Sequence, residues 1–347
     1  MNDQADSRLI QTLPELHLTA GGPKVEMSPG LFGLRLPLPF ALDHVNLWLL
    51  KDGSGWTLID TGIDDEPTRG FWRSHLESGL HGRSIERLIA THFHPDHMGL
   101  AGWLAEQTGA GFWATRTEWL LSRALAHDVS PSFVEAGRSF DLRAGLNPER
   151  ITERASRGNL YRTRASAPPS AINRVKEGDD LVIDGEHWRV LIGRGHAPEM
   201  ITLYSAERNL LIAADQILQK ISPNISVWPA EPDADPLNDY IESLEPYRDL
   251  PETTLVLPSH GQPFRGLHAR IDQLIGHHQD RLERAVDAAG DGRTAIEIMP
   301  ALFDRELDSH QLGFALGEAI AHLNHLVCKR LLLRVEDSDG VYRYSRV

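Results

Sequence analysis

Short apolar runs alternate with longer amphipathic segments along the first third of the chain. The runs are bounded by turn residues and are too short for helices, whereas the longer segments repeat their apolar positions every three or four residues. The predicted strands are 44–52, 55–62 and 84–92, and the predicted helices are 66–79 and 98–109. Alternating strands and helices predict an α/β fold, and place the polar residues after residue 90 beyond the carboxyl end of a strand.

A helical segment interrupts this alternation between about residues 114 and 176. Residues 117–128 and 147–158 have helical spacing, while Pro168-Pro169 makes the stretch around them irregular. We interpret the whole segment as an inserted helical lid.

Strands return after residue 176. The predicted strands lie in 179–193, 200–215 and 253–261, and residues 235–250 are predicted to form a helix with Asp235 as its N-cap. The second of these ranges resembles a hairpin. This part of the chain therefore completes the α/β domain, which we place at residues 1–266.

The chain changes character after residue 267. Residues 268–290 are predicted to form one long helix, shorter helices follow, and residues 331–345 resemble a hairpin. Helices followed by a β-wing are typical of a winged helix. We therefore expect a second, winged-helix-like domain at residues 267–347.

Composition limits the classes of function. The chain has 347 residues, enough for a large and a smaller domain, and its formal charge of −14 argues against a general nucleic-acid or anionic-membrane binder. A basic leader followed by an apolar segment is not recognisable, nor is a run long enough for a membrane span. The single cysteine, Cys328, favours a reducing compartment, so we expect a cytoplasmic protein, with Cys328 buried on a helix.

Three histidines and an aspartate crowd the stretch THFHPDHMG, which follows the strand at 84–92. Most of the 17 histidines are expected to be surface or core residues. Here, however, His92 and His94 can converge on one ion while Asp96 and His97 reach a second. Imidazole and carboxylate ligands without thiolate suit zinc, manganese or iron.

Further ligands must come from other loops. His196, Asp215 and His260 each stand just beyond an apolar run, where a strand delivers a side chain to a shared edge. A carboxylate can bridge two cations because each oxygen can bind one. One predicted strand in each half of the domain ends at an aspartate, Asp60 or Asp215, and a later strand in each half ends at a histidine, His92 or His260. This repetition suggests two related halves that meet at one site.

This set in this order resembles the metallo-β-lactamase superfamily of hydrolases over about residues 30–265. The resemblance rests on Asp60, the H-x-H-x-D-H run, His196, Asp215 and His260. It implies an αββα sandwich with the metals at one edge of the two sheets. It also implies that His92, His94 and His196 bind one metal, that Asp96, His97 and His260 bind the other, and that Asp215 bridges them.

Departures from the family's pattern narrow the choice among the branches of the superfamily. Asp215 stands where many true β-lactamases have a cysteine, and the sequence is nearer to glyoxalase II-like hydrolases and their thioesterase, lactonase and ribonuclease relatives. Even so, GHAPEM lacks the second histidine of the usual G-H-T-P-G-H, and the carboxy-terminal domain departs from glyoxalase II.

The implied chemistry is hydrolysis with two divalent ions. Zinc is the favoured metal, and iron or manganese are the alternatives. Two such ions share a water molecule and lower its pKa to near neutrality, and the resulting hydroxide attacks an ester, thioester or phosphodiester. The resemblance gives catalytic roles to Asp96, which orients the nucleophile or moves its proton, and to Asp60, which orients the metal ligands. We favour a thioester such as an acyl-CoA or acyl-glutathione.

Candidate substrate contacts lie on the lid and after Asp215. Residues 150–174 hold six arginines and one glutamate, which form either a solvated helix face or an anion-binding wall that includes Arg162 and Arg164. Trp228 offers an apolar wall, or packs structurally.

Three alternatives remain. An endoribonuclease or phosphodiesterase of the same superfamily is the first, a lactonase the second, and a regulatory protein without turnover the third. Residues 268–347 carry ten Lys and Arg against thirteen Asp and Glu, so this domain would repel phosphates and nucleic acid is an improbable partner. A structural or homodimer-forming role suits it better.

Overall fold

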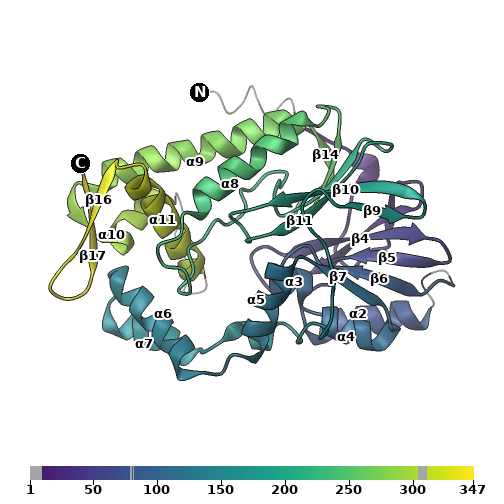
Figure 1. The fold of residues 1–347 in the computed structure, drawn as a ribbon, viewed down its shortest axis with the longest axis horizontal. Coiled ribbons are helices and arrows are strands. Elements are labelled where there is room, and N and C mark those ends of the chain that lie inside the picture. Colours follow the sequence, from purple (N-terminus) through teal and green to yellow (C-terminus); the bar gives the residue numbers. More distant parts are fainter. Residues whose placement is uncertain (1–9, 79, 81, 304–310) are drawn as a thin grey trace.

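Two β-sheets face each other, and helices cover the outer face of each (Figure 1). The computed structural model describes residues 10–78, 80, 82–303 and 311–347. The predicted αββα sandwich with a helical insertion and a carboxy-terminal helical region is confirmed. The first nine residues, on which the expectation of no leader partly rests, and the last residue of the helix predicted at 66–79 lie outside the described residues.

The first sheet has seven strands, and its outer face packs on two helices. Trp72 and Leu104 come from those helices and bury their side chains against Leu47, Leu58 and Leu88 of the sheet. In sheet order the strands are β2 Val25–Ser28, β3 Leu31–Pro37, β4 His44–Asp52, β5 Gly55–Ile59, β6 Ile85–Ile89, β7 Gly111–Ala114 and β8 Asn173–Arg174, and the helices are α2 Glu66–Glu77 and α4 Ala101–Thr108.

The second sheet also has seven strands, and α8 (Pro236–Leu244) and α9 (Leu267–Ala289) cover its outer face (Figure 1). Its inner face meets the first sheet in a core that includes Trp48 and Trp188. In sheet order the strands are β1 Gln11–Thr12, β14 Phe264–Arg265, β13 Leu255–Pro258, β12 Leu210–Ala214, β11 Met200–Ser205, β10 Glu186–Gly193 and β9 Asp180–Ile183. A 3₁₀ turn, η1 Pro14–Leu16, follows β1.

The helix predicted at 235–250 is shorter than expected. Asp235 caps it as predicted, since its side chain accepts a hydrogen bond from the Asn238 N–H. The α-helix ends at Leu244 and continues as a 3₁₀ turn, η4 Glu245–Asp249. Pro246 lacks the N–H that an α-helical turn needs, which accounts for the change.

The two sheets repeat one arrangement of strands. In the first, β3, β4 and β5 are antiparallel neighbours and β5 then pairs in parallel with β6. In the second, β10, β11 and β12 are antiparallel and β12 pairs in parallel with β13. At the end of the equivalent strands β5 and β12, Asp60 and Ala214 both have positive φ angles, 63° and 47°. The repeat places the polar residues of both halves at one edge.

The insertion leaves β7 and returns at β8, but most of it does not lie over the sandwich (Figure 1). Phe140 and Ile151, from its second and third helices, share a core with Leu316 of the carboxy-terminal region. The pattern along the chain did not predict the second helix, although Ser130 caps it and Pro131 begins it. Its helices are α5 Arg116–His127, α6 Pro131–Arg143, α7 Pro148–Ser156 and the 3₁₀ turn η3 Leu160–Thr163.

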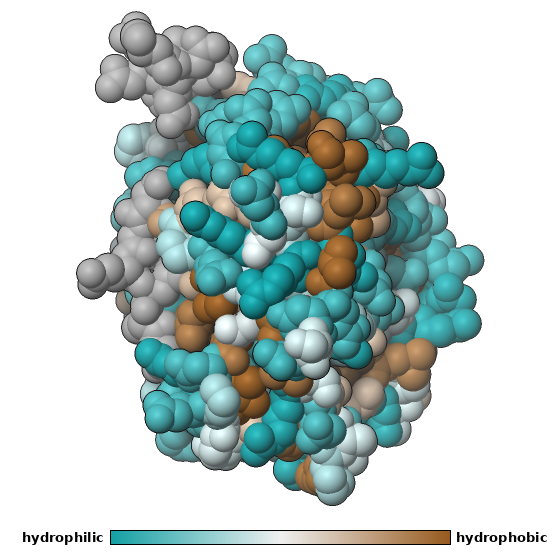
Figure 2. Space-filling model, turned by 90° about the vertical axis from the view of Figure 1, so that its left-hand side faces the viewer, coloured by the Kyte–Doolittle hydropathy of each residue, from teal (hydrophilic) through white to brown (hydrophobic). Residues whose placement is uncertain are grey.

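The carboxy-terminal module contains helices and a three-stranded sheet in the order β15-β17-β16, as expected for a helix-and-wing unit. Helix α9 belongs to both regions, because Ile271 packs on the second sheet while Ala289 packs in the module. The outer face of the module is mostly hydrophilic, with separate hydrophobic patches (Figure 2). Its other elements are β15 Asp291–Arg293, α10 Ala295–Ile298, the 3₁₀ turn η5 Met299–Ala301, α11 Gln311–Cys328, β16 Leu332–Glu336 and β17 Tyr342–Arg346.

Two features of α11 bear on the expectations from the sequence. Every residue from Ala315 to Leu326 is buried, so the helix lies within the molecule. Cys328, by contrast, is exposed. The expectation that Cys328 is buried is wrong, because it is the last residue of the helix and lies beyond the buried turns. Among the described residues, none of the helices is long and apolar enough to cross a membrane.

Candidate metal centre

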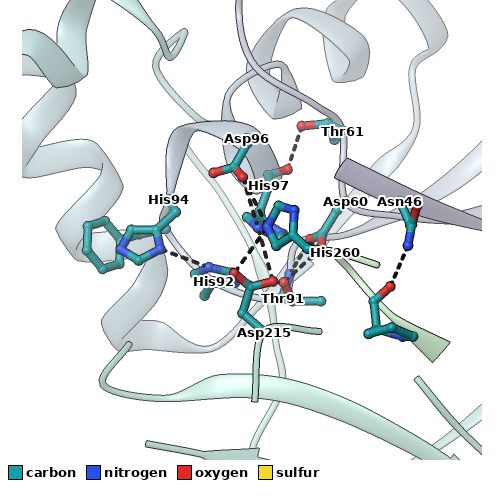
Figure 3. A network of polar contacts seen from close by, with 12 residues as sticks. Asn46, Asp60, Thr61, Thr91, His92, His94, Asp96, His97, Asp215 and His260 are labelled. Carbon is teal, nitrogen blue, oxygen red and sulfur yellow. Dashed lines mark hydrogen bonds and ion pairs between the residues drawn. The ribbon is translucent and has the colours of Figure 1, made fainter. Parts of the chain in front are cut away.

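The histidine-rich stretch forms the connection that leaves β6. His92 and His94 lie on the loop itself, whereas Asp96 and His97 lie on a one-turn helix, α3 Pro95–Met98, which Pro95 begins. The loop turns its polar side chains into the interior at the edge of the sheets (Figure 3). Thus the first four candidate ligands come from a single connection of the first sheet.

The second sheet supplies the remaining candidates. His196 follows β10, Asp215 follows β12 and His260 follows β13, so each lies where the sequence placed it. The structure brings all seven predicted ligands together. They form three sets whose ligand atoms lie within 4.8 Å of one another: His92, His94 and His196; His92, His97 and Asp215; and Asp96, His97 and His260.

Asp215 lies between the two outer sets. Its Oδ2 atom is 3.3 Å from His196 Nε2 and 3.3 Å from His260 Nε2, and its Oδ1 atom is 3.6 Å from His97 Nε2. Asp96 faces two of these three histidines, with Oδ2 3.5 Å from His97 Nε2 and 3.5 Å from His260 Nε2. The carboxylate of Asp215 therefore faces histidines of both outer sets, and its role as a bridge between two cations stays a prediction.

Several polar atoms that face this centre have no hydrogen bond within the described part of the chain. They are His97 Nε2, His196 Nε2 and Asp215 Oδ1, and all three are buried. A buried polar atom without a partner costs about 1–3 kcal/mol, so native structures rarely leave three together. Divalent cations bound by imidazole nitrogens and carboxylate oxygens would satisfy all of them, and these residues fit such a group.

Asp60 lies behind the ligands and fixes one of them. Its carboxylate accepts hydrogen bonds from the Thr91 N–H at 2.7 Å and the Thr91 hydroxyl at 2.9 Å, and its Oδ2 is 2.8 Å from His97 Nδ1. With Nδ1 bonded to Asp60, the Nε2 atom of His97 points at Asp96 and Asp215 (Figure 3). A carboxylate at this place is suited to orient His97, and the predicted role of Asp60 in orienting the ligands stays a prediction.

Main-chain carbonyls fix two other histidines in the same way. His260 Nδ1 is 2.7 Å from the His44 carbonyl oxygen, and His196 Nδ1 is 2.8 Å from the Asn224 carbonyl oxygen. Nδ1 donates in both pairs, so Nε2 is the nitrogen left for a metal. Gly195, next to His196, has a φ of 91°, and a Cβ there would collide with the main chain of Pro236. A glycine is therefore required at position 195 for the chain to place His196 at the centre.

The charges at the centre divide it into two parts. Burial and the neighbouring imidazoles lower the pKa of His92 and lower that of His94 to about 3, which leaves both neutral. Burial also lowers the pKa of His97 and His260, but the carboxylates of Asp96 and Asp215 outweigh it and raise both pKa values. One part therefore holds the neutral imidazoles of His92 and His94, and the other pairs the imidazoles of His97 and His260 with carboxylates.

The candidate substrate residues differ in the contacts that they make. Trp228 is 44% exposed, and the centroid of its ring is 6.3 Å from that of the His94 ring, so it borders the site. The Arg164 guanidinium lies 4.8 Å from the centroid of the Phe40 ring, and Arg162 Nε donates to the Ala126 carbonyl at 3.3 Å. The roles of all three in substrate binding stay predictions.

Half of the predicted arginine wall is engaged elsewhere. Arg154 pairs with Asp141, while Arg150 and Arg157 pair with Glu153 on their own helix. Arg150 and Arg157 match the alternative of a solvated helix face, whereas Arg154 pairs with a buried carboxylate. Of the six arginines of the predicted wall, Arg162, Arg164 and Arg174 remain as candidates for binding an anion.

Sequence reasoning missed the residues that hold the loops. Asn46 Nδ2 donates to the carbonyls of Pro258 at 2.8 Å and Gly261 at 3.0 Å, next to His260. Glu118, on α5, accepts from the Phe93 N–H, and burial raises its pKa to about 7. A signal existed for both, since each is a polar residue at an apolar position of its element.

Comparisons with known proteins agree with this geometry. The profile of the metallo-β-lactamase superfamily matches residues 41–260, and that of a metallo-β-lactamase-like C-terminal domain matches residues 280–347. The probable metallo-hydrolase YqjP of Bacillus subtilis is 26% identical over 329 residues, which cover 90% of this chain and 97% of that protein.

Solved structures match over nearly the whole chain. A β-lactamase domain protein from Burkholderia ambifaria has a TM-score of 0.91 and 40% sequence identity, and the match covers 99% of this chain and 100% of that one. A metallo-β-lactamase family protein from Thermus thermophilus has a TM-score of 0.79 and 30% identity over 93% of this chain and 100% of that one. The chain therefore belongs to the metallo-β-lactamase superfamily.

Proposed function

We propose that this metallo-hydrolase binds two divalent cations, with zinc as the favoured metal, and cleaves a thioester such as an acyl-CoA or acyl-glutathione. One observation supports the proposal above all others. Seven imidazole and carboxylate side chains from four separate loops converge, and three of their buried polar atoms have no hydrogen bond within the described residues. Because those atoms face one another, two cations would satisfy them together.

When bound, two cations in such a site lower the pKa of a shared water molecule and polarise the electrophilic oxygen of the substrate. Asp96 is suited to guide the attacking water. Its side chain is 20% exposed, against 7% for Asp215, so a water molecule or substrate can reach it from solvent. A carboxylate there can accept a hydrogen bond from the water and hold its proton. His97 keeps its orientation through Asp60.

The thioester is favoured because the surroundings of the site combine an apolar wall with cationic side chains. Trp228 borders His94, and Arg162 and Arg164 follow Tyr161, a residue that packs on the metal-site loop. An acyl chain could lie on the tryptophan while an anionic group, such as a phosphate or carboxylate, meets the arginines.

Nucleic-acid hydrolysis is less well supported. In a winged helix the second of two adjacent helices enters the major groove. Helix α11 of the carboxy-terminal module is buried from Ala315 to Leu326, so these residues offer no exposed face to a nucleic acid. An RNA phosphodiester or a lactone remains an alternative substrate.

The test is metal analysis of the purified chain, followed by turnover of acyl-CoA thioesters, acyl-glutathione, lactones and single-stranded RNA. We expect two bound metals per chain and turnover of a thioester without RNA cleavage. Asp215→Ala should lose metal and most activity, whereas His187→Ala, which changes an exposed histidine, should keep both. RNA cleavage without thioester turnover would replace the proposed substrate, and a chain without metal would remove the proposed function.

The same panel tests the substrate residues. Replacing Arg162 and Arg164 with serine should raise KM for CoA thioesters and leave KM for small neutral esters unchanged. An equal change for both kinds of substrate would show that the two arginines support the fold and do not bind an anionic group.

A further inference from the structure

Glu118 is the least expected charged group near the metal centre. It lies on α5, in the insertion, and its side chain is completely buried. Its Oε2 atom accepts a hydrogen bond from the Phe93 N–H at 2.9 Å, and its Oε1 atom accepts one from the Glu199 N–H at 2.6 Å. A buried carboxylate is costly to desolvate, so its two acceptor bonds must offset a large penalty.

The two N–H groups belong to the loops that carry three of the candidate ligands. Phe93 lies between His92 and His94 in the loop after β6, and Glu199 lies three residues after His196 in the loop after β10. These loops come from different sheets. One carboxylate therefore joins the two loops whose histidines must approach each other to form the set His92, His94 and His196.

Other side chains of the same segment bind the carbonyl groups of the same two residues. The Tyr161 hydroxyl donates to the Phe93 carbonyl at 2.6 Å, and the Thr115 hydroxyl donates to the Glu199 carbonyl at 3.0 Å. Phe93 and Glu199 thus have both their N–H and their C=O groups bonded to side chains from the segment that begins after β7. Because both main-chain groups of Phe93 and Glu199 are bonded, the histidines on the same two loops have little freedom to move.

We propose that Glu118 is a positioning residue for the metal centre. By joining the two loops, it sets the separation between His196 and the pair His92 and His94, and so makes metal affinity at this position depend on the helical insertion. This inference rests on the proposed metal binding, and it concerns the residue that fixes the distance between the ligands of the two loops. The preformed spacing lowers the cost of ordering the ligands when a cation binds.

Glu118→Gln tests the proposal with little change in side-chain volume. The amide keeps one acceptor but turns an NH₂ group toward the other main-chain N–H, so one bond between the loops is lost. We expect the affinity for one of the two zinc ions to fall about 10- to 100-fold, as for other residues that orient ligands. Competition with a chromophoric chelator measures the affinity, and the absorption spectrum of the cobalt-substituted chain should change with it.

Asp141→Asn is the matched control. Asp141 is another buried carboxylate of the insertion, but it lies on α6 and bonds Arg154 at 2.7 Å. This variant should lower the melting temperature of the metal-free chain while it leaves zinc affinity and the cobalt spectrum unchanged. If Glu118→Gln does not fold, Tyr161→Phe removes one bond to the same loop and should weaken zinc binding in the same direction.

The outcomes separate the two proposals. Wild-type protein that binds two metals, with unchanged affinity in Glu118→Gln, overturns the positioning role and leaves the proposed function standing. Equal losses of affinity in Glu118→Gln and Asp141→Asn also overturn it, because general destabilisation then accounts for the effect. Wild-type protein that binds no metal overturns both.

Discussion

A single aspartate shows how much of the site depends on residues that do not bind metal. Asp60 has a φ of 63°, an unusual backbone conformation for an aspartate, at the end of β5. This conformation carries a cost that the surrounding bonds to Thr91 and His97 must offset. The carboxylate in turn holds His97 Nδ1, so that the other ring nitrogen faces the centre.

We therefore expect Asp60→Asn to weaken binding of the cation near Asp96, His97 and His260. The amide has one acceptor oxygen for the three donors that the carboxylate serves, and metal affinity should fall about 10- to 100-fold. Chelator competition on the purified variant measures this. Asp52→Asn, which changes a carboxylate bonded to the Thr57 hydroxyl at the far end of β4, serves as control and should bind metal normally. Normal affinity in Asp60→Asn would contradict the orienting role.

At the residue scale, the sequence predicted the candidate ligands that come together and Asp60 behind them, but not the other residues that hold the loops. His92, Asp215 and the others each follow an apolar run, and the rule that polar residues gather beyond strand ends was enough to find them. Asn224 gave no such signal, since it supports His196 with its carbonyl oxygen, a group that every residue has. Contacts made by main-chain groups do not depend on the residue type, so the sequence does not reveal them.

At the scale of elements, the contact between α9 and α11 contains a pair of buried histidines. His278 Nδ1 is 3.2 Å from His322 Nε2, and His322 Nδ1 donates to the Glu318 carbonyl at 2.8 Å. Both rings are completely buried. Burial, with smaller contributions from neighbouring cationic groups, lowers the pKa of His278 and lowers that of His322 to about 3. Both histidines are therefore neutral in the folded protein.

This pair predicts a loss of stability in acid. The unfolded chain takes up protons on these histidines near pH 6.5 and the folded chain does not, so the free energy of unfolding falls as pH drops from about 6.5 toward 3. Each histidine contributes a slope of about 1.4 kcal/mol per pH unit in this window.

Denaturant unfolding of wild type and His278→Gln at several pH values measures the slope. The variant lacks one titrating group, so its stability should depend less steeply on pH below 6.5. His187→Gln, on the exposed surface, should not flatten the curve in this way. Parallel curves for wild type and His278→Gln would contradict the assignment.

The elements themselves were predictable where their apolar spacing was regular. The long helix α9 and the hairpin of β16 and β17 lie where the pattern placed them. Helix α6 was missed because Phe133, Phe140 and Leu142 alternate with polar residues too loosely to mark a face. Its partner surface comes from the carboxy-terminal module, which local spacing does not reveal.

At the scale of the whole molecule, the metal centre joins the two sheets. His92, His94, Asp96 and His97 belong to connections of the first sheet, and His196, Asp215 and His260 to those of the second. The carboxy-terminal module also reaches the centre, because Asn224 Nδ2 donates to Glu318 Oε2 at 3.2 Å while the Asn224 carbonyl holds His196.

Removal of metal should therefore loosen the whole fold and not only the site. A cation present at 100 times its dissociation constant stabilises the folded state by about 2.7 kcal/mol, which corresponds to several degrees in Tm. Thermal unfolding with and without a chelator measures the difference. In His196→Ala the chelator should have a much smaller effect, and an identical shift in both proteins would mean that the chelator acts elsewhere.

The spacing of the ligands along the chain also sets an order of events during synthesis. A ribosome delivers His92 to His97 first, His196 and Asp215 after about another hundred residues, and His260 last of the seven. A nascent polypeptide can offer only one sheet's donors until its later half has emerged. Tight retention of metal would consequently require that synthesis has passed residue 260, and a product terminated before that residue should bind metal weakly.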